Sequence, residues 1–128
     1  MTGGKRLKKR IMIVDDSRVV YLQIKKLLQD TEFEIVEYCQ DGESVLQAYE
    51  NCRPDLVTMD IVMPGMDGLD AARLLIEKWP AARILMVSSL FYDSTIDEAR
   101  KIGVKGFIYK PLEKDSLLKA LGQVSECP

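Results

Sequence analysis

The sequence predicts an α/β fold, a doubly wound parallel sheet of five strands with helices on both faces. Short apolar runs alternate along the chain with stretches whose apolar residues recur at helical spacing. Five such strand-helix repeats are typical of a parallel sheet with right-handed crossovers. With 128 residues, the chain is long enough for one domain with a substantial core.

Each predicted element rests on a local pattern. The strand candidates are the apolar runs at 11–14, 33–38, 55–60, 82–87 and 106–109. Helical spacing joins Val20, Ile24, Leu27 and Leu28, then Val45, Ala48, Tyr49 and Cys52, and then Leu69, Ala72, Ile76 and Trp79. Weaker patterns predict helices at about 93–102, before Gly103, and at 113–124. Asp41-Gly42 is compatible with a hairpin, but the helical period after it favours a strand-to-helix connection.

The order of the strands follows from how apolar each run is. The run at 33–38 alternates apolar and acidic residues, which places it at an edge of the sheet. The runs at 11–14, 55–60 and 82–87 are apolar nearly throughout, which places them inside. This pattern favours the order 2-1-3-4-5, a flavodoxin-like (βα)5 three-layer sandwich whose switch point lies between the first and third strands.

Charged residues follow three of these strands at their carboxyl ends. Asp15 and Asp16 follow the first strand, Asp60 ends the third, and Lys110 follows the fifth. Because open parallel sheets bind ligands at the carboxyl ends of their strands, we expect these side chains to converge. Crowded carboxylates repel one another, so such a cluster favours a hard divalent cation with oxygen ligands.

Composition excludes several classes of protein. The net charge is −2, but residues 1–10 carry five basic side chains and no acidic one, which leaves 13 basic against 20 acidic residues, or −7, for the rest. An acidic body argues against direct DNA binding. Three cysteines without CxxC spacing and the lack of histidine argue against a zinc site and suggest a reducing cytoplasmic compartment. No apolar run approaches the roughly 20 residues of a spanning helix, so no membrane insertion is expected.

Four motifs together resemble the receiver domain of two-component response regulators. They are Val14-Asp15-Asp16-Ser17, the segment from Met59-Asp60 to Asp67-Gly68, Val87-Ser88-Ser89, and Tyr109-Lys110-Pro111. The resemblance covers roughly residues 9–124 and divides the chain into a basic leader (1–9), a receiver domain (10–124) and a C-terminal tail (125–128). Length alone suggests a stand-alone chemotaxis-type (CheY-like) regulator.

The resemblance implies a phosphoacceptor and a metal site. Asp60 would accept the phosphoryl group as an acyl phosphate. Mg²⁺ would be bound directly by Asp16, Asp60 and the backbone carbonyl of Val62, with Asp15 acting through water. The plain alternatives are a turn-capping Asp60 and a helix-capping aspartate in the pair, although Ser17 is an equally good cap.

Three further residues take switch positions in the resemblance. Lys110 would contact a phosphoryl oxygen and pair with Asp60 beforehand. Ser88 would be the switch hydroxyl and Tyr109 the aromatic switch. The alternatives are a solvated lysine, ordinary loop polarity and a half-buried strand tyrosine. In the family the bond equivalent to Lys110-Pro111 is typically cis.

The implied function is a phosphorylation-activated signalling switch rather than an enzyme acting on other molecules. A sensor histidine kinase or phosphotransfer protein would supply the phosphoryl group, and a target protein would bind helix 4, strand 5 and helix 5, near residues 93–121. One alternative is a Mg²⁺-dependent phosphatase, but the second acid it needs two places after the nucleophile is Val62. The others are a segment of a larger regulator, since Val87–Leu90 is similar to chemotaxis methylesterase receivers, and a phosphorylation-independent docking module.

Overall fold

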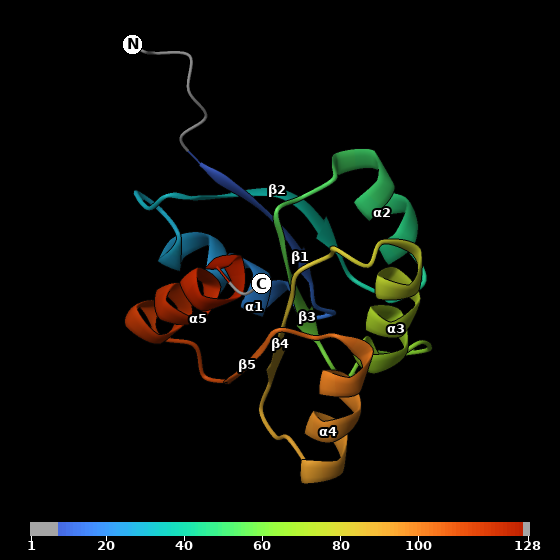
Figure 1. The fold of residues 1–128 in the computed structure, drawn as a ribbon. Helices are drawn as coiled ribbons and strands as arrows, with labels where there is room; N and C mark the ends of the chain where they lie inside the picture. The colour runs from blue at the N-terminus through green and yellow to red at the C-terminus, as the bar shows by residue number, and fades with distance from the viewer. Residues whose placement is uncertain (1–7, 127–128) are drawn as a thin grey trace.

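The computed structural model describes residues 8–126 and shows a five-stranded parallel sheet in the order β2-β1-β3-β4-β5 (Figure 1). The predicted fold class and strand order are therefore confirmed. In chain order the elements are β1 (Lys9–Val14), α1 (Arg18–Leu27), β2 (Phe33–Cys39), α2 (Val45–Cys52), β3 (Leu56–Asp60), α3 (Gly68–Lys78), β4 (Ile84–Ser88), α4 (Asp93–Ile102), β5 (Gly106–Tyr109) and α5 (Lys114–Glu126).

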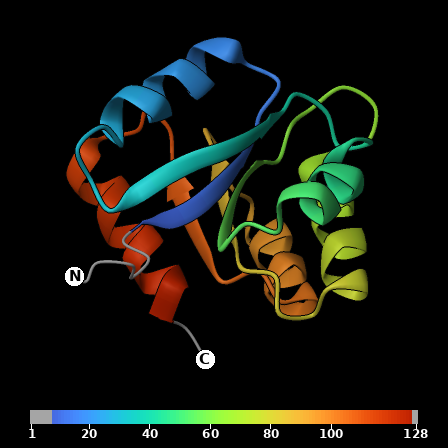
Figure 2. The ribbon, with the colours of Figure 1, turned by 90° about the horizontal axis from the view of Figure 1, so that it is seen from above.

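The helices cover the two faces of the sheet unequally, as Figure 2 shows. Helices α1 and α5 bury one face, where Ile24 and Leu121 pack against β1, β3 and β4. Helices α2, α3 and α4 cover the other face, where Leu75 packs on the β-strand methionines. Helix α4 contributes a single fully buried residue, Ala99, to this second layer. The result is the predicted three-layer sandwich.

Local sequence signals set the ends of several helices. The Ser17 side chain accepts a hydrogen bond from the Val20 backbone and caps α1. Asp67 caps α3 in the same way through the Asp70 backbone. Gly103 ends α4 with φ at 119°, a left-handed conformation that suits glycine. Asp41-Gly42 leads into α2, so the strand-to-helix connection is confirmed over the hairpin.

Some boundaries differ from the predicted ones. Strand β4 runs from Ile84 to Ser88 rather than over 82–87, because Ala82 donates its backbone N–H to Trp79 in a turn and the Ser88 carbonyl accepts from Lys110 in the sheet. Helix α5 continues to Glu126. Of the predicted leader (1–9) and tail (125–128), residues 1–7 and 127–128 lie outside the described part of the chain.

The structure describes two of the three thiols and all of the helices. Cys39 and Cys52 are free, and burial raises the pKa of the Cys39 thiol to about 11, which keeps it protonated at neutral pH. Cys127 lies outside the described residues. Over residues 8–126, no helix is both long and apolar enough to cross a membrane.

Thr58 offers a test of the core. Its hydroxyl is buried in the middle of β3 and has no hydrogen-bond partner among the described residues. A buried hydroxyl without a partner costs about 1–3 kcal/mol, so we expect Thr58→Val to raise the free energy of unfolding by about 1 kcal/mol. Urea denaturation of the two proteins measures the difference.

Thr31 provides the matched control for that substitution. Its hydroxyl donates to the Leu28 carbonyl at 2.6 Å and accepts from the Phe33 backbone at 3.3 Å. Thr31→Val should therefore lower the free energy of unfolding by about 1 kcal/mol. Equal effects of the two substitutions would show that the Thr58 hydroxyl is satisfied.

Candidate functional site

The site lies where β1, β3 and β5 end at the same edge of the sheet. Asp15 follows β1, Asp60 is the last residue of β3, and Lys110 follows β5. Along each strand, every second side chain faces α1 and α5, as Ile13, Leu56 and Ile108 do. Asp15, Asp60 and Lys110 continue these three rows, so the pleat of the sheet directs them to the same side.

Three carboxylates converge at this edge, as predicted. Asp15, Asp16 and Asp60 each offer one carboxylate oxygen, and these oxygens lie within 4.8 Å of one another. Asp15 and Asp60 are buried, whereas Asp16 is exposed. One oxygen of Asp15 accepts a hydrogen bond from the Ser17 backbone at 2.9 Å, which fixes its side chain at the start of α1.

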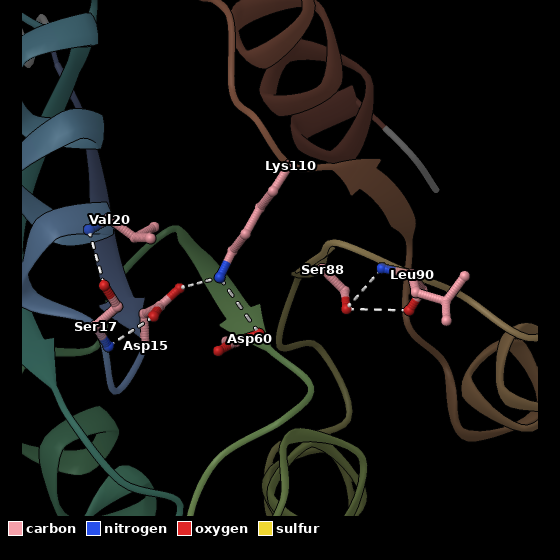
Figure 3. Close-up of polar contacts among 7 residues, drawn as sticks. All are labelled: Asp15, Ser17, Val20, Asp60, Ser88, Leu90 and Lys110. Atoms are coloured by element: carbon pink, nitrogen blue, oxygen red, sulfur yellow. Dashed lines mark hydrogen bonds and ion pairs between the residues drawn. The ribbon is translucent and has the colours of Figure 1, made fainter.

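Lys110 reaches into the cluster and contacts two of the three acids (Figure 3). Its Nζ lies 3.2 Å from Asp15 Oδ2 and 3.6 Å from Asp60 Oδ1. The predicted pairing with Asp60 is present, but Asp15 is the nearer partner. The Lys110-Pro111 peptide bond is cis.

The pKa of Asp60 lies well above the ordinary value of an aspartate. Burial, followed by the negative charge of Asp15, raises the pKa of Asp60 from 3.8 to about 6. Lys110 and a hydrogen bond with the Val62 backbone oppose this increase without cancelling it. The two buried acids share one ammonium group, and with Asp16 nearby the cluster keeps an excess of negative charge.

This pKa predicts a specific pH dependence of stability in the metal-free protein. Folded Asp60 holds its proton up to about pH 6, whereas the unfolded group loses it near 3.8, so the free energy of unfolding should fall as the pH rises between these values. The amide of Asp60→Asn does not titrate. In EDTA, the free energy of unfolding of Asp60→Asn, relative to that of the wild type, should therefore be higher at pH 7 than at pH 4 by roughly 2 kcal/mol. Denaturation at both pH values measures this gain.

The control for the pH experiment is Asp70→Asn. Asp70 is exposed on α3, where it pairs with Arg73. Its removal should leave the difference between pH 4 and pH 7 as in the wild type. If the free energies of unfolding of Asp60→Asn and wild type differed by the same amount at pH 4 and at pH 7, the result would contradict the raised pKa of Asp60.

Ser88 lies at the end of β4, beside the acidic cluster but not hydrogen-bonded to it. Its hydroxyl donates to the Leu90 carbonyl at 3.1 Å and accepts from the Leu90 backbone N–H at 3.4 Å (Figure 3). The side chain is buried, so these contacts hold it in a closed local turn. Movement toward Asp60 would require it to release the Leu90 carbonyl.

Tyr109 lies opposite Ser88 in the sheet and its side chain is 56% exposed. Phe91 holds the ring from one side: the Phe91 and Tyr109 ring centroids are 5.0 Å apart at an interplanar angle of 81°. The same Phe91 ring contacts Phe107 edge to face at 5.4 Å. Sequence reasoning did not identify Phe91, although an aromatic pair directly after Ser88-Ser89-Leu90 was a visible signal.

A cleft of about 310 Å³ opens over Asp60. Its rim is apolar on one side, with Val62 74% and Leu90 58% exposed. The lining residues are Asp60, Val62, Ser88, Ser89, Leu90, Tyr92 and Lys110. The cleft therefore joins Asp60, Ser88 and Lys110 in one space large enough for a phosphoryl group.

The donor set fits a hard divalent cation. Converging carboxylate oxygens with excess negative charge are the ligands that Mg²⁺ and Ca²⁺ prefer. No histidine exists in the chain, and the free thiols Cys39 and Cys52 are not members of the cluster, so a softer metal has no matching ligands there.

Comparison with known proteins identifies the family. The family model for the response regulator receiver domain matches residues 11–122. The chain therefore belongs to the response regulator receiver domain family, a component of two-component signalling systems.

Individual relatives narrow the class to CheY-like receivers. The chain is 36% identical to the chemotaxis protein CheY of Listeria monocytogenes over 117 residues, covering 91% of this chain and 98% of the relative. It is 39% identical to the chemotaxis protein CheY of Bacillus subtilis over 114 residues, covering 89% and 95%. Similarity to the longer transcriptional regulatory protein DegU of Brevibacillus brevis, 32% identical, covers 91% of this chain but 50% of that protein.

Solved structures agree with this assignment. CheY in the CheX-CheY-BeF3-Mg complex from Borrelia burgdorferi superposes with a TM-score of 0.86 at 32% identity, covering 91% of this chain and 88% of that one. The response regulator domain of Thermotoga maritima CheB superposes with a TM-score of 0.86 at 28% identity, covering 94% and 98%. The fold and the family are thus shown by sequence and by structure.

Proposed function

We propose that this receiver domain is a phosphorylation-activated switch that accepts a phosphoryl group on Asp60 in the presence of Mg²⁺. The observation that carries the proposal is the convergence of Asp60 with Asp15, Asp16 and Lys110 beside a cleft that Asp60 and Lys110 line. A structural role alone does not account for three acids and one shared ammonium at a sheet edge, because their repulsion costs stability.

Each residue has a defined part in the proposed transfer. An Asp60 carboxylate oxygen attacks phosphorus and forms an acyl phosphate, while the bond between phosphorus and the donor's nitrogen or oxygen breaks. Asp16, Asp60 and the Val62 carbonyl would hold Mg²⁺, with Asp15 acting through water, and the metal would neutralise phosphoryl charge. Lys110 provides a second positive charge for a phosphoryl oxygen once the contact with Asp60 is replaced.

The switch begins with the Ser88 hydroxyl. On phosphorylation it would leave the Leu90 carbonyl and donate to a phosphoryl oxygen. Because Leu90 is followed by Phe91, which contacts Tyr109, the change would reach the tyrosine on β5. Tyr109 would then move inward and alter the surface formed by α4, β5 and α5.

The proposed partners follow from the exposed surfaces. A sensor histidine kinase or phosphotransfer protein would supply the phosphoryl group. Val19 and Leu22, exposed on α1, which begins two residues after Asp16, offer it an apolar contact. A target protein would bind near residues 93–121. The CheY from Borrelia burgdorferi forms a complex with CheX, so a protein of that kind is a further partner class. We propose a cytoplasmic protein that neither binds DNA nor inserts into a membrane.

The proposed chemistry concerns only this domain's own phosphorylation and dephosphorylation. A phosphatase acting on other molecules would need an acid where Val62 stands. Because the DegU relative is twice as long as the matched segment, a segment similar to this chain also occurs as one part of a longer regulatory protein.

Labelling with acetyl phosphate tests the proposed function. With Mg²⁺, intact-mass spectrometry should detect one phosphate per chain, and the label should be lost in hydroxylamine, which cleaves acyl phosphates. Excess EDTA should prevent labelling. A stable label that resists hydroxylamine, or equal labelling in EDTA, would contradict the proposal.

The lifetime of the phosphorylated state provides a separate prediction. Hydrolysis requires a water molecule aligned behind phosphorus, opposite Asp60. Val62 and Leu90 flank the cleft, are exposed and apolar, and cannot orient that water. We therefore expect this protein to lose its phosphoryl group more slowly than other members of its family. Val62→Asn combined with Leu90→Glu should speed the loss about tenfold, equivalent to about 1.4 kcal/mol of barrier.

The measurement is the decay of phosphoprotein after removal of the donor, in excess Mg²⁺. Val62→Ala with Leu90→Ala is the control, since it widens the cleft without adding a hydrogen-bonding group. Equal decay of wild type and the Asn/Glu variant would show that these two side chains do not control water.

A further inference from the structure

The loop between β3 and α3, residues 61–67, carries Val62 and is held by hydrogen bonds at two points. At its base, the Gly68 backbone N–H donates to the Ile61 carbonyl at 2.7 Å. Near its tip, the Met66 backbone N–H donates to Glu43 Oε2 at 3.2 Å. Glu43 lies 23 residues earlier in the chain, in the turn between β2 and α2, so the second bond joins two separate loops.

The two loops fit closely around this carboxylate. Gly65 has φ at +74°, and a Cβ atom there would lie 2.7 Å from Glu43 Oε2. On the other side, a Cβ on Gly42 would lie 2.7 Å from the Met66 carbonyl oxygen. Glycine at both contact points allows the Glu43 carboxylate to lie directly over the loop.

The turn that carries Glu43 is itself held in place. Asp41 Oδ1 accepts from the Ser44 backbone at 2.9 Å and from the Ser44 hydroxyl at 2.8 Å. These bonds close the turn on both sides of Glu43. The carboxylate is therefore presented from a fixed base, and only the Glu43 side chain itself must be ordered to make the contact.

We propose that Glu43 is a positioning residue for the phosphorylation site, acting through the Met66 backbone on the loop that carries Val62. By fixing residues 61–67, it would keep the Val62 backbone beside Asp60, ready to bind the cation. The proposal rests on the proposed function for the role of Val62, and it goes beyond it by assigning a role to a residue outside the site.

An alternative effect of Glu43 is its charge. A negative charge near an acidic cluster also favours cation binding, whatever hydrogen bonds it makes. Glu43→Gln separates the two effects, because the amide oxygen can still accept from Met66 while the charge is lost. Glu50→Ala is the matched control, since Glu50 is an exposed glutamate on α2 that pairs with Lys78 instead.

Two measurements on the full chain test the proposal. In EDTA, hydrogen exchange should be about fivefold faster for the amides of residues 62, 63 and 65–67 in Glu43→Ala than in wild type, Glu43→Gln or Glu50→Ala. In calorimetric titrations with Mg²⁺ alone, Glu43→Ala should bind about fivefold more weakly, and Glu43→Gln should recover most of the loss.

The outcomes separate this inference from the proposed function. Equal exchange in Glu43→Ala and Glu50→Ala would overturn the positioning role. So would equal losses of Mg²⁺ affinity in Glu43→Ala and Glu43→Gln, because the charge would then explain the effect. If neither the wild type nor any variant bound Mg²⁺, that result would count against the proposed metal. Faster exchange in Glu43→Ala would still support Glu43 as the residue that fixes the loop.

Discussion

Asp60→Asn should abolish phosphorylation by acetyl phosphate. The substitution keeps the size of the side chain at the end of β3 but replaces the nucleophilic carboxylate with an amide, which does not form an acyl phosphate. Asp15 is also buried in the cluster, but its oxygens are engaged by Ser17 and Lys110. No second carboxylate should therefore replace Asp60 as acceptor. Intact-mass spectrometry of the labelled proteins measures the result.

Two sets of variants control this experiment. Asp70→Asn removes an exposed acid on α3 and should label at the wild-type rate. Asp16→Ala should weaken Mg²⁺ binding more than Asp15→Ala, since Asp16 is the proposed direct ligand and Asp15 acts through water. Detection of one phosphate on Asp60→Asn at the wild-type rate would refute the assignment of the acceptor.

Gly68→Ala should be the most destabilising glycine-to-alanine substitution in residues 8–126. A Cβ atom at this first position of α3 would lie 1.9 Å from the Asp60 carbonyl oxygen and 2.8 Å from its carbonyl carbon. Both atoms belong to the backbone, so no flexible side chain can move aside. We expect a loss of about 3 kcal/mol or more in the free energy of unfolding, measured by urea denaturation.

Gly122→Ala is the matched control. Gly122 lies within α5, and a Cβ atom there would meet nothing within 4 Å among the described residues. Because alanine has a higher helix propensity than glycine, the free energy of unfolding of this variant should rise by about 0.5–1 kcal/mol. If the free energy of unfolding of Gly68→Ala remained within about 1 kcal/mol of the wild-type value, α3 would not approach the end of β3 as closely as described.

The strand order and the place of the site could be predicted because each depends on one-dimensional patterns. The acidic residues Glu34 and Glu37 marked β2 as an edge strand, and the structure places it there. Asp15, Asp60 and Lys110 each occur at a strand end, and parallel strands bring their ends together. Such patterns can be recognised in the sequence without knowledge of side-chain conformations.

Contacts that depend on rotamers and on packing between loops could not be predicted. The sequence did not show that Asp15 lies nearer to Lys110 than Asp60 does, or that Ser88 bonds to its neighbour Leu90. It also did not show the contact between Phe91 and Tyr109, because each ring belongs to a different element. The roles of Ser88 and Tyr109 in switching remain predictions.

The closed turn at Ser88 has a consequence for the energetics of signalling. In the unphosphorylated protein no phosphoryl oxygen takes the place of the Leu90 carbonyl, so moving the Ser88 hydroxyl away from it costs the net worth of one hydrogen bond, about 1 kcal/mol. Two states separated by so little are both populated at room temperature. The unphosphorylated protein should therefore visit the active arrangement part of the time, and substitutions in residues 88–92 should adjust its basal output without altering the chemistry at Asp60.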